Sequence, residues 1–291
     1  MRQQHVQLSN RPFLAVAMPL VVLQAAFFLV PLALTIALSF QQTEYFQTVW
    51  TWDFSNWIHV FSKVYIWKTL WHTILLSVLT VGLCLIIAFP VCYAMITRAK
   101  DYLNHIKVLI VFAFLTDAIL KTFGWVLFLD TSGGLNFLLS FLGVQFASDS
   151  FLFTDWATVM GMVYTLLPFM IFTIFLAMDN IDRDLFNAAA DAGASKLRTF
   201  WEVTVPLCRP GIWAGAVLVF LYGMGSFLEP KVLGGGKSPM ASELIRQTFE
   251  VRVNWPLGAA LTLVLMATCI VVVIVFSKLY PARIHREQVD A

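Results

Sequence analysis

Six long apolar runs constrain this chain more than any other feature of its sequence. They occupy about residues 13–40, 69–97, 108–129, 156–178, 211–228 and 255–276. About 20 apolar residues are enough for a helix to cross a bilayer, and a helix satisfies its own backbone hydrogen bonds in lipid. The sequence therefore predicts an all-α, polytopic membrane protein with about six transmembrane helices.

The composition agrees with this class and leaves no room for a large soluble domain. Hydrophobic residues make up 59% of the 291 residues and charged residues 12%, whereas a soluble domain carries about a quarter charged residues. The first apolar run is longer than the roughly 7–15-residue core of a cleaved signal peptide, so we expect a retained anchor. A net charge of +2 gives no indication of a nucleic-acid partner.

Positive charges favour one side of the membrane. Six spans place the N-terminal segment, the turn 98–107, the loop 179–211 and the C-terminal tail on the same side, where most of the 19 Lys and Arg residues lie. Because short cytoplasmic loops are enriched in Lys and Arg, we predict that both termini and the 179–211 loop are cytoplasmic.

The sequence contains no recognisable catalytic or metal-binding pattern. The four cysteines lie in or beside apolar runs without the spacing of a metal or redox site, and the five histidines are dispersed. The run 234–238 contains Gly-Lys-Ser, but Lys231 stands where a nucleotide-binding P-loop requires glycine. We therefore predict that the chain is not an enzyme and has no cofactor of its own.

The longest polar insert on the positive side, residues 182–212, has the pattern of two short helices around a glycine. Asp182 or Asp184 is placed to cap a helix that continues to about residue 192. Gly193 suits the left-handed conformation that commonly ends a helix. The insert is therefore expected to begin with one short helix and a glycine corner.

A second short helix is expected over about residues 196–203, with Ser195 as its cap and Pro206 and Pro210 as its end. The insert also offers apolar side chains of the kind that anchor interfaces. It is either a docking surface for a partner or an amphipathic connector without one. The anchor candidates are Phe186, Leu197, Phe200 and Trp201.

The same insert resembles the "EAA" signature of the permease subunits of bacterial ABC importers. Asn187 replaces the glutamate of that signature. Three further stretches, 164–170, 223–236 and 254–260, resemble the spermidine/putrescine-type permease subfamily. The positions that match the signature are Ala188, Ala189, Asp191, Gly193, Ala194, Ser195, Phe200, Pro206, Leu207, Pro210 and Gly211.

The resemblance implies the permease fold of type I ABC importers in a bacterial inner membrane. Residues 1–12 and 281–291 would be cytoplasmic termini, and 13–280 the transmembrane permease domain. The chain would pair with a second homologous permease subunit, a cytoplasmic ABC ATPase dimer that binds ATP and Mg, and an extracytoplasmic solute-binding protein. The implied ATPase-coupling residues are Asn187, Ala188, Ala189, Asp191, Gly193, Ala194, Ser195, Phe200 and Pro206.

The resemblance also suggests the cargo. It indicates a polyamine, such as putrescine or spermidine, or a related amine. An amino-acid-like or anionic solute carried by the same machine is one alternative. Another is a secondary transporter driven by an ion gradient, although the internal repeats expected of that class are not apparent in the sequence.

Charged and aromatic residues in or beside the spans are candidates for the translocation path. Asp117 and Lys121 have i, i+4 spacing and either line the path or neutralise one another. Glu229 either attracts a cationic amine or sits in water at the mouth of the fifth span. Gly211 and Gly215 permit close packing of a helix, within this chain or against the second subunit. The aromatic candidates for stacking on an ammonium group are Trp125, Tyr164, Tyr222 and Phe227.

Overall fold

The computed structural model describes residues 10–44, 47–97, 108, 110, 112–141 and 151–279 of the chain. It confirms the predicted helical architecture. The only strands among the described residues are two short ones that form a single sheet. The chain divides into two compact units. The first comprises Met1–Ser62 and Thr248–Val264, and the second comprises Lys63–Gln247 and Leu265–Ala291.

The first unit joins a long apolar helix to a small polar hairpin. The Asn56 side chain donates hydrogen bonds to the backbone oxygens of Gln41 at 2.7 Å and Ser39 at 3.3 Å, which ties the helix after the hairpin to the end of the first helix. The unit's elements are α1 (Asn10–Ser39), the antiparallel strands β1 (Gln42–Glu44) and β2 (Gln47–Val49), α2 (Ser55–Ser62), and the first part of α13 (Trp255–Leu279).

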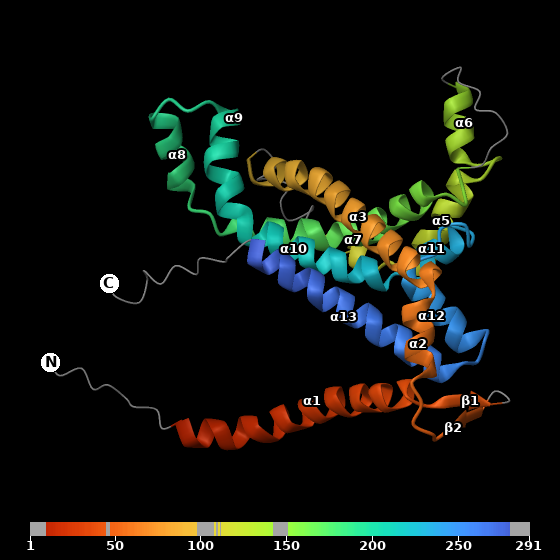
Figure 1. Cartoon of the computed structure of the whole chain (residues 1–291). Helices are drawn as coiled ribbons and strands as arrows, with labels where there is room; N and C mark the ends of the chain where they lie inside the picture. Colours follow the sequence, from red (N-terminus) through yellow and green to blue (C-terminus); the bar gives the residue numbers. More distant parts are fainter. Residues whose placement is uncertain are drawn as a thin grey trace. The chain divides into compact units, whose positions relative to one another are not determined.

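The second unit has three long helices at its centre, α3, α7 and α10, which pack against one another around the main apolar core. In Figure 1, α8 and α9 project from one end of this group, and α5 and α11 lie at the other end. Its elements are α3 (Val64–Thr97), α5 (Ala118–Leu129), α6 (Gly134–Phe141), α7 (Asp155–Asp179), α8 (Arg183–Asp191), α9 (Lys196–Thr199), the π-helix η2 (Phe200–Thr204), α10 (Val205–Gly225), α11 (Leu228–Val232) and α12 (Ala241–Glu250).

Two glycines allow α7 and α10 to approach closely. A Cβ atom at Gly211 would lie 2.4 Å from the Ala177 Cβ, and one at Gly215 would lie 2.4 Å from the Thr173 Oγ1. No side chain larger than hydrogen fits at either position without a shift of the neighbouring helix. The Gly211/Gly215 pair therefore packs within this chain, which decides between the two alternatives left open by the sequence.

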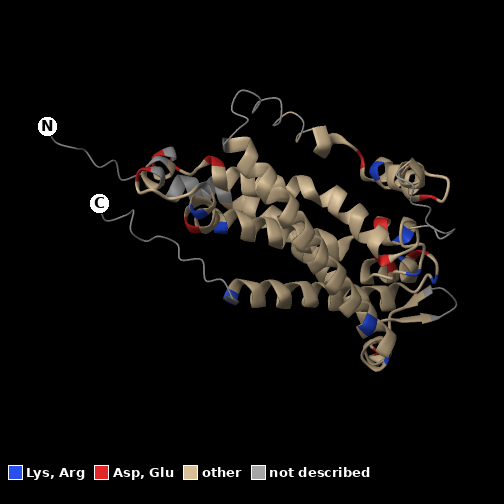
Figure 2. Cartoon of the chain, turned by 90° about the horizontal axis from the view of Figure 1, so that it is seen from above, with Lys and Arg blue, Asp and Glu red and all other residues tan. Residues whose placement is uncertain are grey.

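Five helices among the described residues are long and apolar enough to cross a membrane. They are Met18–Ser39, Val64–Ile96, Asp155–Asp179, Leu197–Gly225 and Trp255–Lys278. Figure 2 shows that charged residues gather towards the ends of the long helices and leave their middle parts uncharged. This arrangement suits helices whose central turns lie in hydrocarbon. Five of the six predicted spans therefore correspond to long helices.

The remaining predicted span, 108–129, is interrupted. Residues 112–115 are helical, the chain bends at Thr116, and α5 begins only after Asp117. The apolar run was continuous in the sequence, but an aspartate that caps a new helix start divides it. With this broken segment counted, about six transmembrane segments are consistent with the structure.

The helix that contains the fifth predicted span is longer than that span, and Pro206 and Pro210 do not end a helix. α9 runs through the π-turn η2 directly into α10, so the apolar helix extends over Leu197–Gly225 rather than 211–228. Pro206 stands in the first turn of α10, directly after the π-turn. Pro210 lies inside α10. Both prolines therefore lie in a helix that continues past them to Gly225.

Candidate functional site

The first helix of the 182–212 insert is closed at both ends by local hydrogen bonds. The Asp182 Oδ1 accepts the Asp184 backbone N–H at 3.0 Å, so Asp182 is the cap of α8. At the other end, the Ala194 N–H donates to the Ala189 oxygen at 3.0 Å across Gly193, which has φ +77°. This six-to-one bond over a left-handed glycine is the Schellman arrangement. The predicted glycine corner is therefore present.

The second half of the insert is fixed to α3 by an aromatic cluster. The Ser195 Oγ accepts the Arg198 N–H at 3.3 Å at the start of α9. The Phe200 ring lies edge-on to the rings of Phe89 and Tyr93, with centroid distances of 5.2 and 5.1 Å. Phe200 therefore holds the insert against this chain's own core. Phe200 was predicted as an anchor for a partner, but its ring faces this chain's own core.

Other apolar side chains of the insert face solvent. Leu197 is 69% exposed, Trp201 61% and Leu185 45%. Ala188, Asp191 and Ser195 are also exposed, and Ala189 and Ala194 are half-buried. The backbone of Asn187 lies within α8, but its side chain is outside the described part of the structure. The insert thus presents large apolar groups among small residues, a surface suited to close contact with another protein.

Asp117 and Lys121 lie one helical turn apart but form no salt bridge with each other. Asp117 precedes α5, and its Oδ1 accepts the backbone N–H groups of Ile119 at 2.7 Å and Leu120 at 3.4 Å. The Lys121 Nζ donates to the backbone oxygen of Ala113 at 2.6 Å, on the other side of the break. Both charges therefore satisfy backbone groups freed by the interrupted helix, a role that their spacing alone did not indicate.

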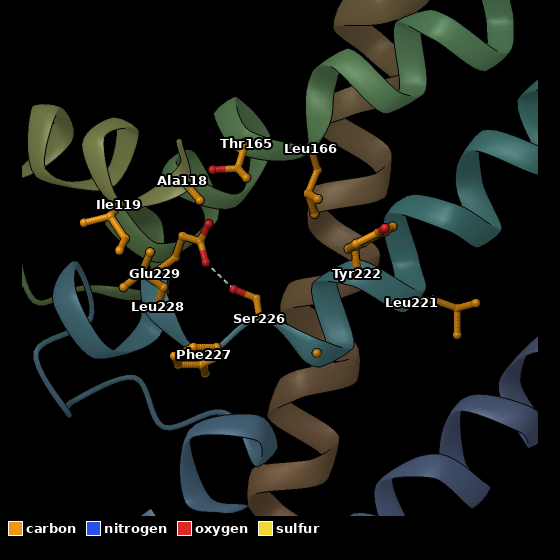
Figure 3. Close-up of a pocket in the computed structure, with 11 residues that line it drawn as sticks. Ala118, Ile119, Thr165, Leu166, Leu221, Tyr222, Ser226, Phe227, Leu228 and Glu229 are labelled. Carbon is orange, nitrogen blue, oxygen red and sulfur yellow. Dashed lines mark hydrogen bonds between the residues drawn. The ribbon is translucent and has the colours of Figure 1, made fainter. Parts of the chain in front are cut away.

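A cavity of about 540 Å³ lies between α5, α7, α10 and α11, and we call it the Glu229 cavity. Its walls are mostly apolar, and Figure 3 shows the Ser226 and Glu229 side chains joined by a hydrogen bond at the start of α11. Among its lining residues Glu229 alone carries a formal charge. They are Ala118, Ile119, Thr165, Leu166, Leu221, Tyr222, Gly225, Ser226, Phe227, Leu228 and Glu229.

A second cavity, of about 450 Å³, shares α5 and α7 with the first, and we call it the Lys121 cavity. Trp125 lies edge-on to Tyr164 across it, with a centroid distance of 5.8 Å. Among its lining residues Lys121 alone carries a formal charge. They are Thr116, Leu120, Lys121, Gly124, Trp125, Phe128 and Tyr164.

The structure brings most of the predicted path residues to these two cavities. Lys121, Trp125 and Tyr164 line one, and Tyr222, Phe227 and Glu229 line the other, while Asp117 lines neither. Sequence reasoning missed Ser226, whose hydroxyl donates to the Glu229 carboxylate. The sequence did contain a signal for this hydrogen bond, because Ser226 stands three residues before Glu229 at the start of a short helix.

Glu229 is not in water at the mouth of a span, which was one of its two predicted settings. Its residue is only 6% exposed. α7 packs closely against α11 at Gly161, where a Cβ atom would lie 2.3 Å from the Leu233 Cδ1 and 3.3 Å from the Glu229 Cγ. A glutamate beside Pro230 looks like an exposed loop residue in sequence, yet here it is buried and lines a cavity.

The described residues contain no group of three or more His, Cys, Asp or Glu side chains that could hold a metal ion. The residues that line the two cavities offer hydrogen-bonding groups, one charge each and aromatic surface. Such features bind and orient a small solute.

Comparisons with known proteins connect this geometry to a family. Residues 104–286, which include the insert and both cavities, match the family model of the binding-protein-dependent transport system inner membrane component. The chain is 34% identical over 235 residues to the spermidine/putrescine transport system permease protein PotB of Haemophilus influenzae, with 80% of this chain and 82% of that protein covered. For the Escherichia coli protein of the same name the values are 32% over 210 residues, with 72% and 76% covered.

Solved structures agree at the level of the fold. A bacterial ABC transporter involved in the import of the acidic polysaccharide alginate has a chain with a TM-score of 0.71 and 16% identity, covering 93% of this chain and 96% of that one. A chain of the MetNI methionine ABC transporter gives a TM-score of 0.55 at 14% identity, covering 74% and 94%. Together with the family match, these findings establish that the chain belongs to the inner-membrane components of binding-protein-dependent transport systems and is a permease subunit of an ABC importer.

Proposed function

We propose that this permease subunit forms half of the translocation path for a polyamine, such as putrescine or spermidine, or for a related amine. The observation that carries the proposal is the similarity to PotB over most of both chains. The Glu229 cavity supports it, because a carboxylate and aromatic faces attract a cation and disfavour an anionic solute. An amino-acid-like or anionic solute is the competing cargo.

The insert around Gly193 is the proposed docking element for a cytoplasmic ABC ATPase dimer. The exposed Leu197 and Trp201 side chains would enter a groove of that partner. Phe200 joins the same insert to α3, so that movement of the docked insert would reach a core helix. The partner would bind and hydrolyse ATP with Mg, and an extracytoplasmic solute-binding protein would deliver the cargo.

The orientation follows from the positive charges of the loops. It places residues 182–212 and both termini in the cytoplasm of a bacterial cell, with the permease domain in the inner membrane. Residues 1–9 and 280–291 lie outside the described residues. Rocking of two homologous permease subunits against one another would then open the path to alternate sides.

The cargo is tested with the complete importer reconstituted in proteoliposomes with its ATPase, second permease and solute-binding protein. Putrescine or spermidine is expected to stimulate ATP hydrolysis and to accumulate in the vesicles, whereas glutamate and a sugar phosphate are not. Stimulation by an anion without stimulation by either amine would contradict the proposed cargo and leave the family assignment unchanged.

A further inference from the structure

We propose that Glu229 is the carboxylate that holds an ammonium group of the cargo inside the membrane domain, with Tyr222 and Phe227 as the aromatic wall of that subsite. This inference rests on the proposed amine cargo. Glu229 would then be the residue that selects a cation. The neighbouring Lys121 cavity carries the opposite charge.

The second unit contains two buried glutamates, Glu229 and Glu243, with different surroundings. Glu243 is 4% exposed and Glu229 is 6% exposed. Glu243 is paired with the Arg246 guanidinium at 2.7 Å and also accepts a hydrogen bond from Gln247 at 2.9 Å. Burial acts to raise the pKa of Glu243, but the hydrogen bonds and charge of these partners outweigh burial and lower it. Glu243 therefore has its cation within the protein.

Glu229 has no such cation. Its hydrogen-bond donor in the described part of the chain is the Ser226 hydroxyl, and no Lys, Arg or His there lies within 4.0 Å of its carboxylate. A buried charge costs several kcal/mol unless it is paired. The missing positive charge is one that an amine cargo supplies.

The cavity around Glu229 suits a short alkyl amine. A volume of about 540 Å³ lies within the range of small-molecule sites, and the walls near the carboxylate are largely aliphatic or aromatic. The Tyr222 ring is held by stacking on Phe169, with a centroid distance of 5.1 Å. Methylene groups can therefore lie on apolar surface while the ammonium group contacts the carboxylate and ring faces.

The Lys121 cavity is unsuited to the same group. It has an ammonium of its own, which the Ala113 backbone oxygen holds at 2.6 Å. Like charges repel one another, and the repulsion grows as they approach. An amine that enters between α5 and α7 is therefore directed towards Glu229 and away from Lys121.

The test compares Glu229→Gln with wild type in the complete importer, reconstituted in proteoliposomes with labelled putrescine. Glutamine keeps the size and the acceptor oxygen but removes the charge. We expect uptake to fall about tenfold or more, as for the loss of a charged hydrogen bond. Binding of putrescine to the isolated solute-binding protein stays unchanged, and Glu229→Asp recovers part of the uptake. Asp130→Asn is the matched control: it also removes one carboxylate charge, but Asp130 lines neither cavity, so uptake should stay at the wild-type level.

The outcomes separate the two claims. Complexes are first compared by yield and gel-filtration profile, so that only assembled variants are scored. If wild type takes up amines and assembled Glu229→Gln does so equally well, Glu229 does not hold the cargo and the inference is wrong. An equal loss in Asp130→Asn would also contradict it. If wild type carries no amine, the proposed cargo fails first, and the assignment of Glu229 fails with it.

Discussion

Gly193 and Gly236 have nearly the same left-handed backbone conformation and equally open surroundings. Gly193 has φ +77° and Gly236 has φ +79°, and a Cβ atom at either position would meet no atom within 4 Å. A side chain at either site therefore costs backbone strain without any steric clash. The two glycines differ in position, since Gly193 lies in the proposed docking insert and Gly236 follows α11.

Gly193→Ala is expected to weaken co-purification of the ATPase subunit, because strain of about 1 kcal/mol displaces α9 relative to α8. Membrane insertion and yield should not change. Gly236→Ala introduces the same local strain elsewhere and should leave ATPase binding at the wild-type level. Equal ATPase binding by both variants and wild type would show that the glycine corner does not shape the docking surface.

Single charged residues were the least predictable part of the chain. The spacing of Asp117 and Lys121 indicated a pair on one helix, but their partners are backbone groups on either side of a break. Glu229 is buried where α11 packs against Gly161 of α7, a different helix. The first relation is local but depends on a helix break that the continuous apolar run hides, and the second arises only when separate helices pack together.

At the scale of elements, the π-helix Phe200–Thr204 makes the docking insert continuous with α10. The Val205 N–H bonds to the Phe200 oxygen, and the buried Thr204 hydroxyl donates to the Thr199 oxygen at 3.4 Å. Sequence reasoning predicted two separate helices here, since prolines usually end a helix. A continuous connection is the stiffer lever, and it supports transmission of movement from the insert to a span.

Phe200→Ala should uncouple ATP hydrolysis from transport. The substitution removes edge-to-face contacts with Phe89 and Tyr93, worth about 0.5–1.5 kcal/mol each. We expect a lower melting temperature, a bound ATPase and reduced uptake per ATP hydrolysed. Trp201→Ala, at the exposed neighbouring ring, should instead weaken ATPase binding with little change in melting temperature. If the two variants behaved alike, Phe200 would have no separate role in coupling.

At the scale of the whole molecule, the sequence predicted the class and most of the spans. Long apolar runs determine membrane helices almost by themselves, because length and hydrocarbon thickness are directly linked. The corner at Gly193 was likewise predictable from a local conformational preference. The break before α5 and the two cavities required tertiary packing, and so did the inward position of Phe200.

The central claim is that an external ATPase moves an amine through this chain by way of the 182–212 insert. It is tested most directly by uptake of labelled putrescine and hydrolysis of ATP, measured in the same proteoliposomes for wild type and for a Leu197→Asp, Trp201→Asp double variant. Both side chains are exposed, so the variant should insert and fold normally. We predict that wild type takes up putrescine only with ATP and that the double variant loses bound ATPase and uptake together. Uptake driven by an ion gradient without ATP, or full uptake and ATPase binding by the double variant, would contradict this account.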